Sequence, residues 1–559
     1  MHQIRLSFDA KAGNSKKKLL AKARKIAPDD PEVLIAYHDT LLFMAAYPDD
    51  AEMLKTVNAE LERVAAVAGK SQGRSWERAL ADTGIGGTRT TSQFTIRIAR
   101  WLSERFGGDV ELDWSDDEAV GRLEEFLPRI TTTVEGDGLR NERYDTRAWA
   151  QMARGRSKQT DLAWLLRRFE QVDASESIKE EMFDRIGMRL RWTHNDFAMS
   201  RSGTRFPARP IFYQSDPLMR AIDAGAIIST KLRETPPLAP TSAMRVLDAA
   251  RATLCARHRE TDPMTYANER EITLLRLDRG IDVALFGMTP DERLPIESYF
   301  GYVAARNRVP MAYGGGWVLG GRCEIGVNIF DEFRGGESAY LFATILRAYR
   351  QHYNVERFFV DPYQFGAGNP EAIASGAFWF YYRLGFRPTD AAARRLAESE
   401  AARIASDRSY RTPPATLRRL AKSRIYLDTG PSDRKAGIPV LGEFDLAEVG
   451  TAVTAWIGRK FDGDLKRARK WSVERAMKLL NPSSHLQWSN DERRAFEAFS
   501  LLIGPIDDLA RWSRPDRRSL GILMAYKGGV LERDFALATQ HYPRLVAAVA
   551  EMAETQARW

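Results

Sequence analysis

The feature that most constrains the fold is a change of hydrophobic period in the middle of the chain. Runs with helical spacing dominate the first two hundred residues, whereas residues 272–277 and 281–286 have the apolar content and length of strands. Helical, charge-rich sequence resumes after Pro388. We therefore expect an α+β fold, in which a mixed-sheet domain is embedded between mainly helical amino-terminal and carboxy-terminal regions.

The length of the chain, 559 residues, exceeds what one hydrophobic core supports, since single cores stop growing at about 250 to 300 residues. Prolines and turn residues become frequent between Ser200 and Asp262, which favours a boundary there. The expected organisation is a helical region over 1–205, a connecting segment over 206–262, the sheet domain over 263–390 and a helical region over 391–559.

Composition narrows the class of protein. A net charge of +8 permits acidic partners such as a nucleotide cofactor, RNA or an acyl carrier. The 2 cysteines and 7 scattered histidines favour neither a disulfide framework nor a metal site. No apolar run approaches the roughly 18 residues that span a bilayer, so we expect a soluble protein with no membrane partner. The low cysteine content fits a reducing cytoplasm, and we expect no bound metal.

The sheet domain is expected to begin with a hairpin that turns at residues 278–280. Strands should follow at 299–305, 311–319, 323–330 and 355–360, with turns at Asn307 and at Gly320 and Gly321 favouring antiparallel neighbours. Helices are expected over 340–353 and 370–384, the second ending at Gly385 because glycine suits a left-handed cap.

The most informative stretch joins the strand at 323–330 to the first of these helices. Apolar residues alternate through Cys323, Ile325, Val327 and Ile329, so Glu324 should face the other side of the sheet. A basic, glycine-containing loop over 334–339 then enters the helix. Unpaired amides and the positive end of the helix dipole point the same way there, which predicts an anion-binding site.

Two motifs in this domain resemble the GNAT superfamily of N-acyltransferases. The residues Glu332-Phe333-Arg334-Gly335 are similar to the entry of that superfamily's pyrophosphate-binding loop. The residues Phe380-Tyr381-Tyr382-Arg383-Leu384-Gly385-Phe386 are similar to the ending of its last helix. The resemblance covers roughly residues 263 to 390.

This resemblance implies transfer of an acyl group from a thioester or related donor to an amine. It implies that acetyl-CoA or another acyl-CoA is held by Arg334, Gly335, Gly336, Ser338 and Ala339, while main-chain amides near Val327 and Ile329 polarise the acyl carbonyl. Glu324 would deprotonate the amine and Tyr381 would protonate the leaving group. An acyl carrier protein or an aminoacyl-tRNA is an alternative donor, and the amine acceptor is not specified.

One position departs from the superfamily's pattern. Glu337 stands where the loop has its central glycine, and a carboxylate there is expected to repel a pyrophosphate. A second hypothesis is therefore a catalytically silent GNAT-like module used for binding or scaffolding, so that enzymatic activity itself stays open. In that case Glu324 is a solvated strand residue, Tyr381 packs among aromatic rings, and Arg334 forms an ion pair with Glu332 or Glu337.

Two basic clusters lie in the carboxy-terminal region. One is at residues 417–422, and the other combines Arg459 and Lys460 with Lys466, Arg467, Arg469 and Lys470. Charged helix faces are ordinarily solvated surfaces, and RNA binding is the alternative interpretation.

Overall fold

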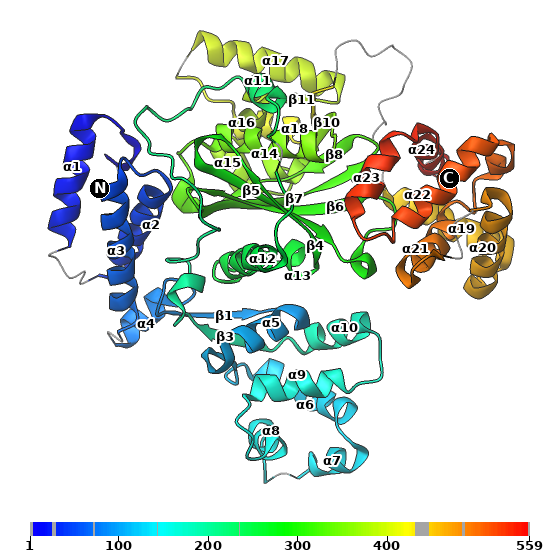
Figure 1. The fold of residues 1–559 in the computed structure, drawn as a ribbon, viewed down its shortest axis with the longest axis horizontal. Helices are drawn as coiled ribbons and strands as arrows, with labels where there is room; N and C mark the ends of the chain where they lie inside the picture. The colour runs from blue at the N-terminus through cyan, green and yellow to red at the C-terminus, as the bar shows by residue number, and fades with distance from the viewer. Residues whose placement is uncertain are drawn as a thin grey trace. The chain divides into compact units, whose positions relative to one another are not determined.

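The computed structural model describes residues 4–24, 30–70, 73–141, 143–233, 235–407, 409–430, 446–482 and 487–556. The described residues form helices and two separate sheets, so the fold is α+β (Figure 1). They divide into two compact units. The first comprises Met1–Pro217, Arg245–Thr265 and Arg306–Pro310; the second comprises Leu218–Met244, Tyr266–Ala305 and Met311–Trp559.

The first unit is mainly helical, as expected, but it also contains a small antiparallel sheet that the sequence did not indicate. Its strand order is β1-β3-β2. The strands are β1 (Arg89–Gln93), β2 (Val110–Leu112) and β3 (Arg189–Thr193). The helices before the connecting segment are α1 (Ala10–Ala23), α2 (Pro31–Ala46), α3 (Ala51–Ala68), α4 (Arg74–Leu80), α5 (Ile96–Phe106), α6 (Asp117–Ile130), α7 (Thr133–Gly138), α8 (Thr146–Arg154), α9 (Asp161–Glu170) and α10 (Glu176–Ile186).

Helices α2 and α3 each begin directly after an aspartate. Asp30 and Asp50 are their amino-terminal caps, and each side chain accepts a hydrogen bond from a backbone amide of the first turn. The two helices pack against each other as a hairpin. Capping thus accounts for Asp30 and Asp50, whereas Asp49 pairs with Lys16 at 3.0 Å.

The second unit is built on a nine-stranded mixed sheet. Its strand order is β11-β12-β10-β8-β7-β6-β5-β4, and β9 pairs with β7 off this path. The strands are β4 (Ala267–Arg276), β5 (Ile281–Met288), β6 (Ser298–Arg306), β7 (Val309–Leu319), β8 (Arg322–Ile325), β9 (Asn328–Ile329), β10 (Arg357–Val360), β11 (Arg387–Pro388) and β12 (Ile425–Asp428).

The antiparallel part of this sheet follows the sequence-based prediction. Strands β4 and β5 form the expected hairpin, with Arg276 opposite Asp282. Gly320 and Gly321 both have positive φ, which suits the tight turn that makes β7 and β8 antiparallel. One difference is that β12 joins the sheet from beyond residue 390, so the carboxy-terminal region is not purely helical.

Three consecutive glycines in β7 let aromatic side chains lie directly on the backbone. A Cβ on Gly314 would come within 2.7 Å of the Tyr302 hydroxyl, and one on Gly315 within 2.3 Å of the Tyr299 hydroxyl. A Cβ on Gly316 would meet the Tyr349 ring at 2.6 Å. Since real Cβ atoms do not approach so closely, this run of glycines is required by the packing above and below β7.

Helix α14 (Ser338–His352) covers the sheet face that carries Cys323, and it matches the expected helix over 340–353. The expected helix over 370–384 is divided into α15 (Pro370–Ser375) and α16 (Ala377–Arg383). The division falls at Gly376, whose φ of 66° is left-handed and ends α15.

The expected connecting segment over 206–262 contains regular structure of its own. It includes α11 (Ala224–Ser229), α12 (Pro240–Cys255) and the short α13 (Asp262–Thr265). Helix α11 packs on α14, where Arg347 donates hydrogen bonds to the carbonyls of Thr230 and Lys231. This part of the segment therefore helps to hold α14 in place.

Helices make up most of the described carboxy-terminal residues. Those after the sheet domain are α17 (Ala391–Ser406), α18 (Pro414–Leu420), α19 (Leu446–Phe461), α20 (Leu465–Leu480), α21 (Asn490–Leu502), α22 (Arg514–Tyr526), α23 (Glu532–Gln540) and α24 (Pro543–Gln556). A core that includes Leu480, Phe499 and Phe535 also takes in Ile296 and Leu319 from the sheet domain, so these helices and the sheet share apolar packing.

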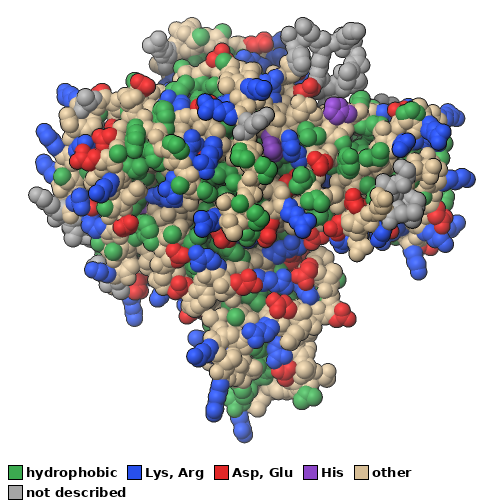
Figure 2. Space-filling model, viewed as in Figure 1, with side chains coloured by type: hydrophobic (Ala, Val, Ile, Leu, Met, Phe, Trp, Pro, Cys, Tyr) green, Lys and Arg blue, Asp and Glu red, His purple; other side chains and the backbone are tan. Residues whose placement is uncertain are grey.

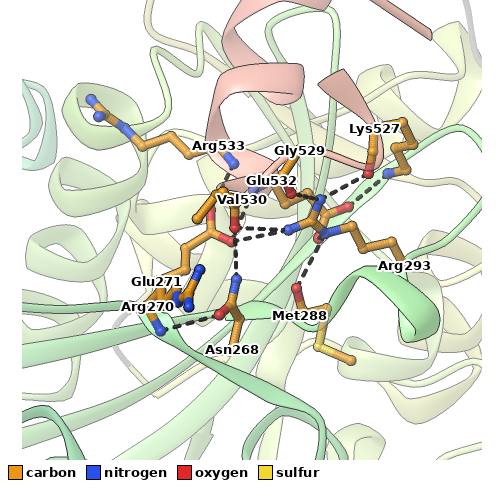
Figure 3. Close-up of polar contacts among 10 residues, drawn as sticks. All are labelled: Asn268, Arg270, Glu271, Met288, Arg293, Lys527, Gly529, Val530, Glu532 and Arg533. Atoms are coloured by element: carbon orange, nitrogen blue, oxygen red, sulfur yellow. Dashed lines mark hydrogen bonds and ion pairs between the residues drawn. The ribbon is translucent and has the colours of Figure 1, made fainter. Parts of the chain in front are cut away.

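A buried cluster of charges joins the sheet to helix α23 (Figure 3). Glu271 of β4 accepts hydrogen bonds from the backbone amides of Glu532 (2.9 Å) and Arg533 (2.7 Å). Leu531, at the cap position of α23, has no side chain that could accept these amides. A carboxylate from a distant strand therefore caps this helix.

The rest of the cluster balances the charge of the two buried glutamates. Lys527 Nζ lies 2.6 Å from Glu532 Oε1, and Arg293 Nη2 lies 3.8 Å from Glu271 Oε2. Arg293 also donates to the carbonyls of Lys527 and Gly529, at 2.8 and 2.7 Å. Two acids and two bases thus form a paired set, as buried charges require.

We predict that Glu271 makes the stability of the protein depend on pH. Burial raises the pKa of Glu271 from 4.5 to about 7. A raised pKa means that the folded state holds this proton more tightly than the unfolded state does. The contribution of protonated Glu271 to the free energy of unfolding is therefore largest at low pH and is lost as pH rises towards 7. Relative to Glu271→Gln, the wild type should lose up to about 3 kcal/mol of unfolding free energy between pH 4.5 and 7.

Urea denaturation of both proteins at several pH values measures this difference. Glu269→Gln, an exposed change on the same strand, serves as the control and should leave the pH profile unchanged. Parallel stability curves for the wild type and Glu271→Gln would contradict the prediction.

Candidate functional site

The loop that leads into α14 is a tight turn, closed by two hydrogen bonds between its own backbone groups. The Arg334 amide donates to the Asp331 carbonyl (3.2 Å), and the Gly336 amide donates to the Phe333 carbonyl (3.1 Å). Gly335 has a φ of 84°, a left-handed conformation that glycine adopts without strain. This turn delivers the chain to the amino terminus of α14.

The amino terminus of α14 has amides available for an anion. Glu337 occupies the cap position, but its side chain does not cap the helix. Among the residues that the structure describes, no hydrogen bond is donated by the amides of Ser338, Ala339 or Tyr340. Ser338 and Ala339 are only half-buried, so an anion can approach the positive end of this 15-residue helix there.

Glu337 is turned into the protein. Its side chain is 1% exposed, and Oε1 lies 2.7 Å from Arg279 Nη2. The same oxygen accepts a hydrogen bond from the Met219 amide at 2.9 Å. The charge of Glu337 is thus balanced by an internal cation. The expectation that Glu337 repels a pyrophosphate assumed instead that its side chain faces the loop.

Arg334 lies at the surface of the same loop. It is 58% exposed and forms ion pairs with Asp331 (2.9 Å) and Glu371 (3.1 Å). The sequence-based alternative paired it with Glu332 or Glu337 instead. Because exposed ion pairs contribute at most about 1 kcal/mol, Arg334 can exchange these partners for a phosphate at little cost.

Strands β8 and β10 run parallel and then separate. Arg322 to Glu324 pair with Arg357 to Phe359. Past Ile325 the chain remains paired with β7, as β9, but no longer pairs with β10, and the expected strand over 323–330 is interrupted at Gly326 and Val327. The Tyr302 hydroxyl donates to the Gly326 carbonyl at 2.8 Å and fixes the point of separation.

The separation exposes two backbone amides on the side that faces away from β7. The amides of Gly326 and Phe330 donate to carbonyls of β7, at Gly315 and Met311. Since N–H groups alternate in direction along a strand, those of Val327 and Ile329 point away from β7, where β10 no longer pairs. These are the two amides that, according to the GNAT resemblance, would polarise the acyl carbonyl.

Tyr381 lies in an aromatic cluster at the end of α16. Its side chain is 3% exposed and its ring packs against Phe342, Phe365 and Phe386, with centroids 5.8, 6.1 and 5.8 Å away. Burial raises the pKa of Tyr381 well above its usual value, so the hydroxyl stays protonated at neutral pH. Burial also raises the pKa of Tyr302, and Tyr381 adds to that effect, which indicates that the two side chains are near each other.

Tyr382 occupies a different environment from Tyr381. Its half-buried ring lies under the Arg387 guanidinium at 4.0 Å and contacts Phe378 and Trp379. The two tyrosines therefore leave α16 in different directions, as one helical step of about 100° requires.

Glu324 lies on the sheet face opposite to Cys323 and α14. It is half-buried and pairs with Arg424 at 3.4 Å. Its cross-strand neighbour Trp317 is 38% exposed, an unusual state for a large aromatic residue within a sheet, and stacks at a tilt on Tyr299. This face therefore offers a carboxylate beside an accessible aromatic surface.

A second carboxylate, Glu297, lies near Glu324 and was not among the sequence-based candidates. Burial raises its pKa; Arg322 opposes this effect and Glu324 reinforces it. Glu297 directly precedes β6, which is separated from β8 in the sheet only by β7, and this arrangement of strands is not visible in a local pattern.

The structure brings some of the predicted residues together and separates others. Arg334 and the backbone of Gly335 to Ala339 form one anion-accepting end of α14. Tyr381 packs on α14 through Phe342, whereas Glu324 lies on the other face of the sheet. The sheet therefore lies between the two catalytic candidates.

Comparisons with known proteins leave the identity of the chain open. No family model, curated protein or solved structure matches it. Within the described residues, no group of three or more His, Cys, Asp or Glu side chains is placed to hold a metal ion. None of the described helices is both long and apolar enough to cross a bilayer.

We predict that Glu337 is required for stability. Glu337→Gly and Glu337→Gln break the ion pair with Arg279 and remove a buried hydrogen-bond acceptor of the Met219 amide, and should destabilise the protein by about 2 to 4 kcal/mol. Arg334→Ala, which breaks only exposed pairs, should cost less than about 1 kcal/mol. Thermal denaturation measures both effects, and a Glu337→Gln protein as stable as the wild type would refute this role.

Proposed function

We propose that the sheet domain of the second unit is an N-acyltransferase of the GNAT type, which moves an acyl group from a thioester to an amine. The observation that carries the proposal is the parallel strand pair that separates beside a helix with an open amino terminus. Together with the sequence motifs, this arrangement supports a site that holds a phosphate at one end and an acyl carbonyl at the other.

The donor is proposed to be acetyl-CoA or another acyl-CoA. Its phosphates accept hydrogen bonds from the amides of Ser338 and Ala339, with Arg334 as counter-charge. The acyl carbonyl accepts from the amides of Val327 and Ile329, which stabilise the oxyanion that forms during transfer. An acyl carrier protein or an aminoacyl-tRNA presents a comparable acyl group and phosphate and is kept as an alternative donor.

The chemical step is proposed to be direct attack of an amine on the acyl carbon. The amine gives up a proton to Glu324, and the new C–N bond forms as the C–S bond breaks. The thiolate that leaves takes its proton from Tyr381. Glu324 acts from one face of the sheet and Tyr381 from the other, so the reacting atoms lie between β8 and β10.

A catalytically silent binding module is the second candidate function. It is favoured by the aromatic rings that surround Tyr381 and by the ion pair between Glu324 and Arg424. In this case the α14 end binds an anionic ligand and no acyl transfer follows.

We predict that Ser338→Glu abolishes binding of acyl-CoA without weakening the fold. An acid in the first turn of a helix is stabilising, but at this position it occupies the place proposed for phosphate. Calorimetry with acetyl-CoA should show binding to the wild type and to the control Ser338→Ala, and none to Ser338→Glu. Equal binding by Ser338→Glu would exclude this site, and no binding by the wild type would exclude acetyl-CoA as donor.

We further predict that Tyr381→Phe lowers turnover about 10²- to 10⁴-fold, the range typical of lost general acid catalysis. Tyr382→Phe should have a mild effect, because that ring lies under Arg387. Release of free thiol from acyl-CoA in the presence of a panel of primary amines measures turnover. Acyl-CoA binding with no thiol release from any amine would favour the silent module.

A further inference from the structure

The second basic cluster of the sequence forms one continuous surface, which we call the α19–α20 corner. It consists of six exposed cations at the end of α19 and the start of α20: Arg459, Lys460, Lys466, Arg467, Arg469 and Lys470. Lys470 approaches Glu474 only at 4.0 Å. Figure 2 shows basic side chains projecting from these helices at the right-hand edge of the view.

The corner is held by packing beneath it. Trp456, Phe461 and Ala468 are buried together and join α19 to α20. Lys460 Nζ lies 3.5 Å from the centroid of the half-buried Trp471 ring, so the end of α19 is also tied to the side of α20. The cations therefore project from a packed helical pair.

The positions of these cations do not help α20 to form. Four of them fall within its first six residues, where the helix dipole disfavours positive charge, and the first turn contains no acid. Lys466 and Lys470 are also four residues apart, a spacing at which like charges repel by a few tenths of a kcal/mol. Since folding does not account for this arrangement, binding of an anion is the better explanation.

The cations spread over the solvent side of α20. Ala468, Ser472 and Ala476 mark its buried side. At about 100° per residue, Lys466, Lys470 and Arg467 span roughly 100° on the other side, and Arg469 lies at the border of the buried side. The surface is convex and the four charges lie within two helical turns, which suits an extended, repeating anion better than one small ligand.

The residues around the corner indicate which class of partner it suits: a membrane, a protein or a nucleic acid. Leu465 is the one large hydrophobic side chain of the corner that is strongly exposed, and the Trp471 ring is covered by Lys460. A membrane-binding surface needs an apolar face to insert, and a stable protein interface needs an apolar centre. The phosphodiester backbone of a nucleic acid needs neither, because it is bound by charge.

We propose that the α19–α20 corner binds the phosphodiester backbone of nucleic acid, RNA or DNA, without reading the bases. The ammonium group of Lys460 lies over the face of the nearest aromatic ring, Trp471, so this ring does not offer a face on which a base could stack. Binding should therefore depend steeply on salt and weakly on sequence. This inference is independent of whether the sheet domain transfers acyl groups.

The test compares two triple variants of the full chain that lose equal charge. Lys466→Gln, Arg469→Gln and Lys470→Gln neutralise the corner and also relieve its charge repulsion, so the fold should be kept. The control, Arg418→Gln, Arg419→Gln and Lys422→Gln, neutralises three exposed cations of the other basic cluster. Fluorescence anisotropy with labelled single-stranded RNA, double-stranded RNA and double-stranded DNA of mixed sequence measures binding at 50 and 200 mM salt.

The corner variant should bind at least 10-fold more weakly than the wild type at 50 mM salt. Its slope of log Kd against log salt should fall by about 2, since each single-strand phosphate contact contributes roughly 0.7. The control should match the wild type, and the three probes distinguish RNA from DNA and single from double strands. Equal loss in both variants, no binding to any probe, or tighter binding to anionic lipid vesicles than to nucleic acid would overturn the proposal.

Discussion

The hydrogen bond from the Tyr302 hydroxyl to the Gly326 carbonyl is the interaction on which the candidate site depends. It holds the chain at the point where β8 stops pairing with β10, and it requires the absence of a side chain at Gly314, where a Cβ would lie 2.5 Å from the same carbonyl. The direction of the Val327 and Ile329 amides follows from this fixed point. The proposed oxyanion site is thus set by packing between strands.

Sequence periodicity was sufficient to predict those elements whose structure depends on neighbouring residues in the chain. The hairpin of β4 and β5, the turn at Gly320 and Gly321 and helix α14 all follow from alternation, turn residues and apolar spacing. Strands that are short or polar were missed, as in β1, whose Arg-Thr-Thr-Ser-Gln sequence has no apolar alternation. Such strands form because they find partners, and a local pattern does not contain that information.

The same limit applies to the candidate site. The glycine loop and the start of α14 were predicted, because an anion site at a helix terminus is a local feature. The burial of Glu337 was not, since its partner Arg279 and the Met219 amide come from distant parts of the sequence. Glu297 was missed for the same reason, and the opposite placement of Glu324 and Tyr381 on the sheet became evident only from the topology.

The cap that Glu271 provides for α23 has a consequence for the order in which the molecule matures. The residues joined by this contact are 261 positions apart, so β4 leaves the ribosome long before its helix exists. Until the last helices are synthesised, the carboxylate has no amides to accept from and Arg293 lacks its carbonyl partners at Lys527 and Gly529. Completion of the sheet's buried edge therefore waits for α23, and a nascent chain that has not yet reached this helix lacks the partners of Glu271 and Arg293 described above.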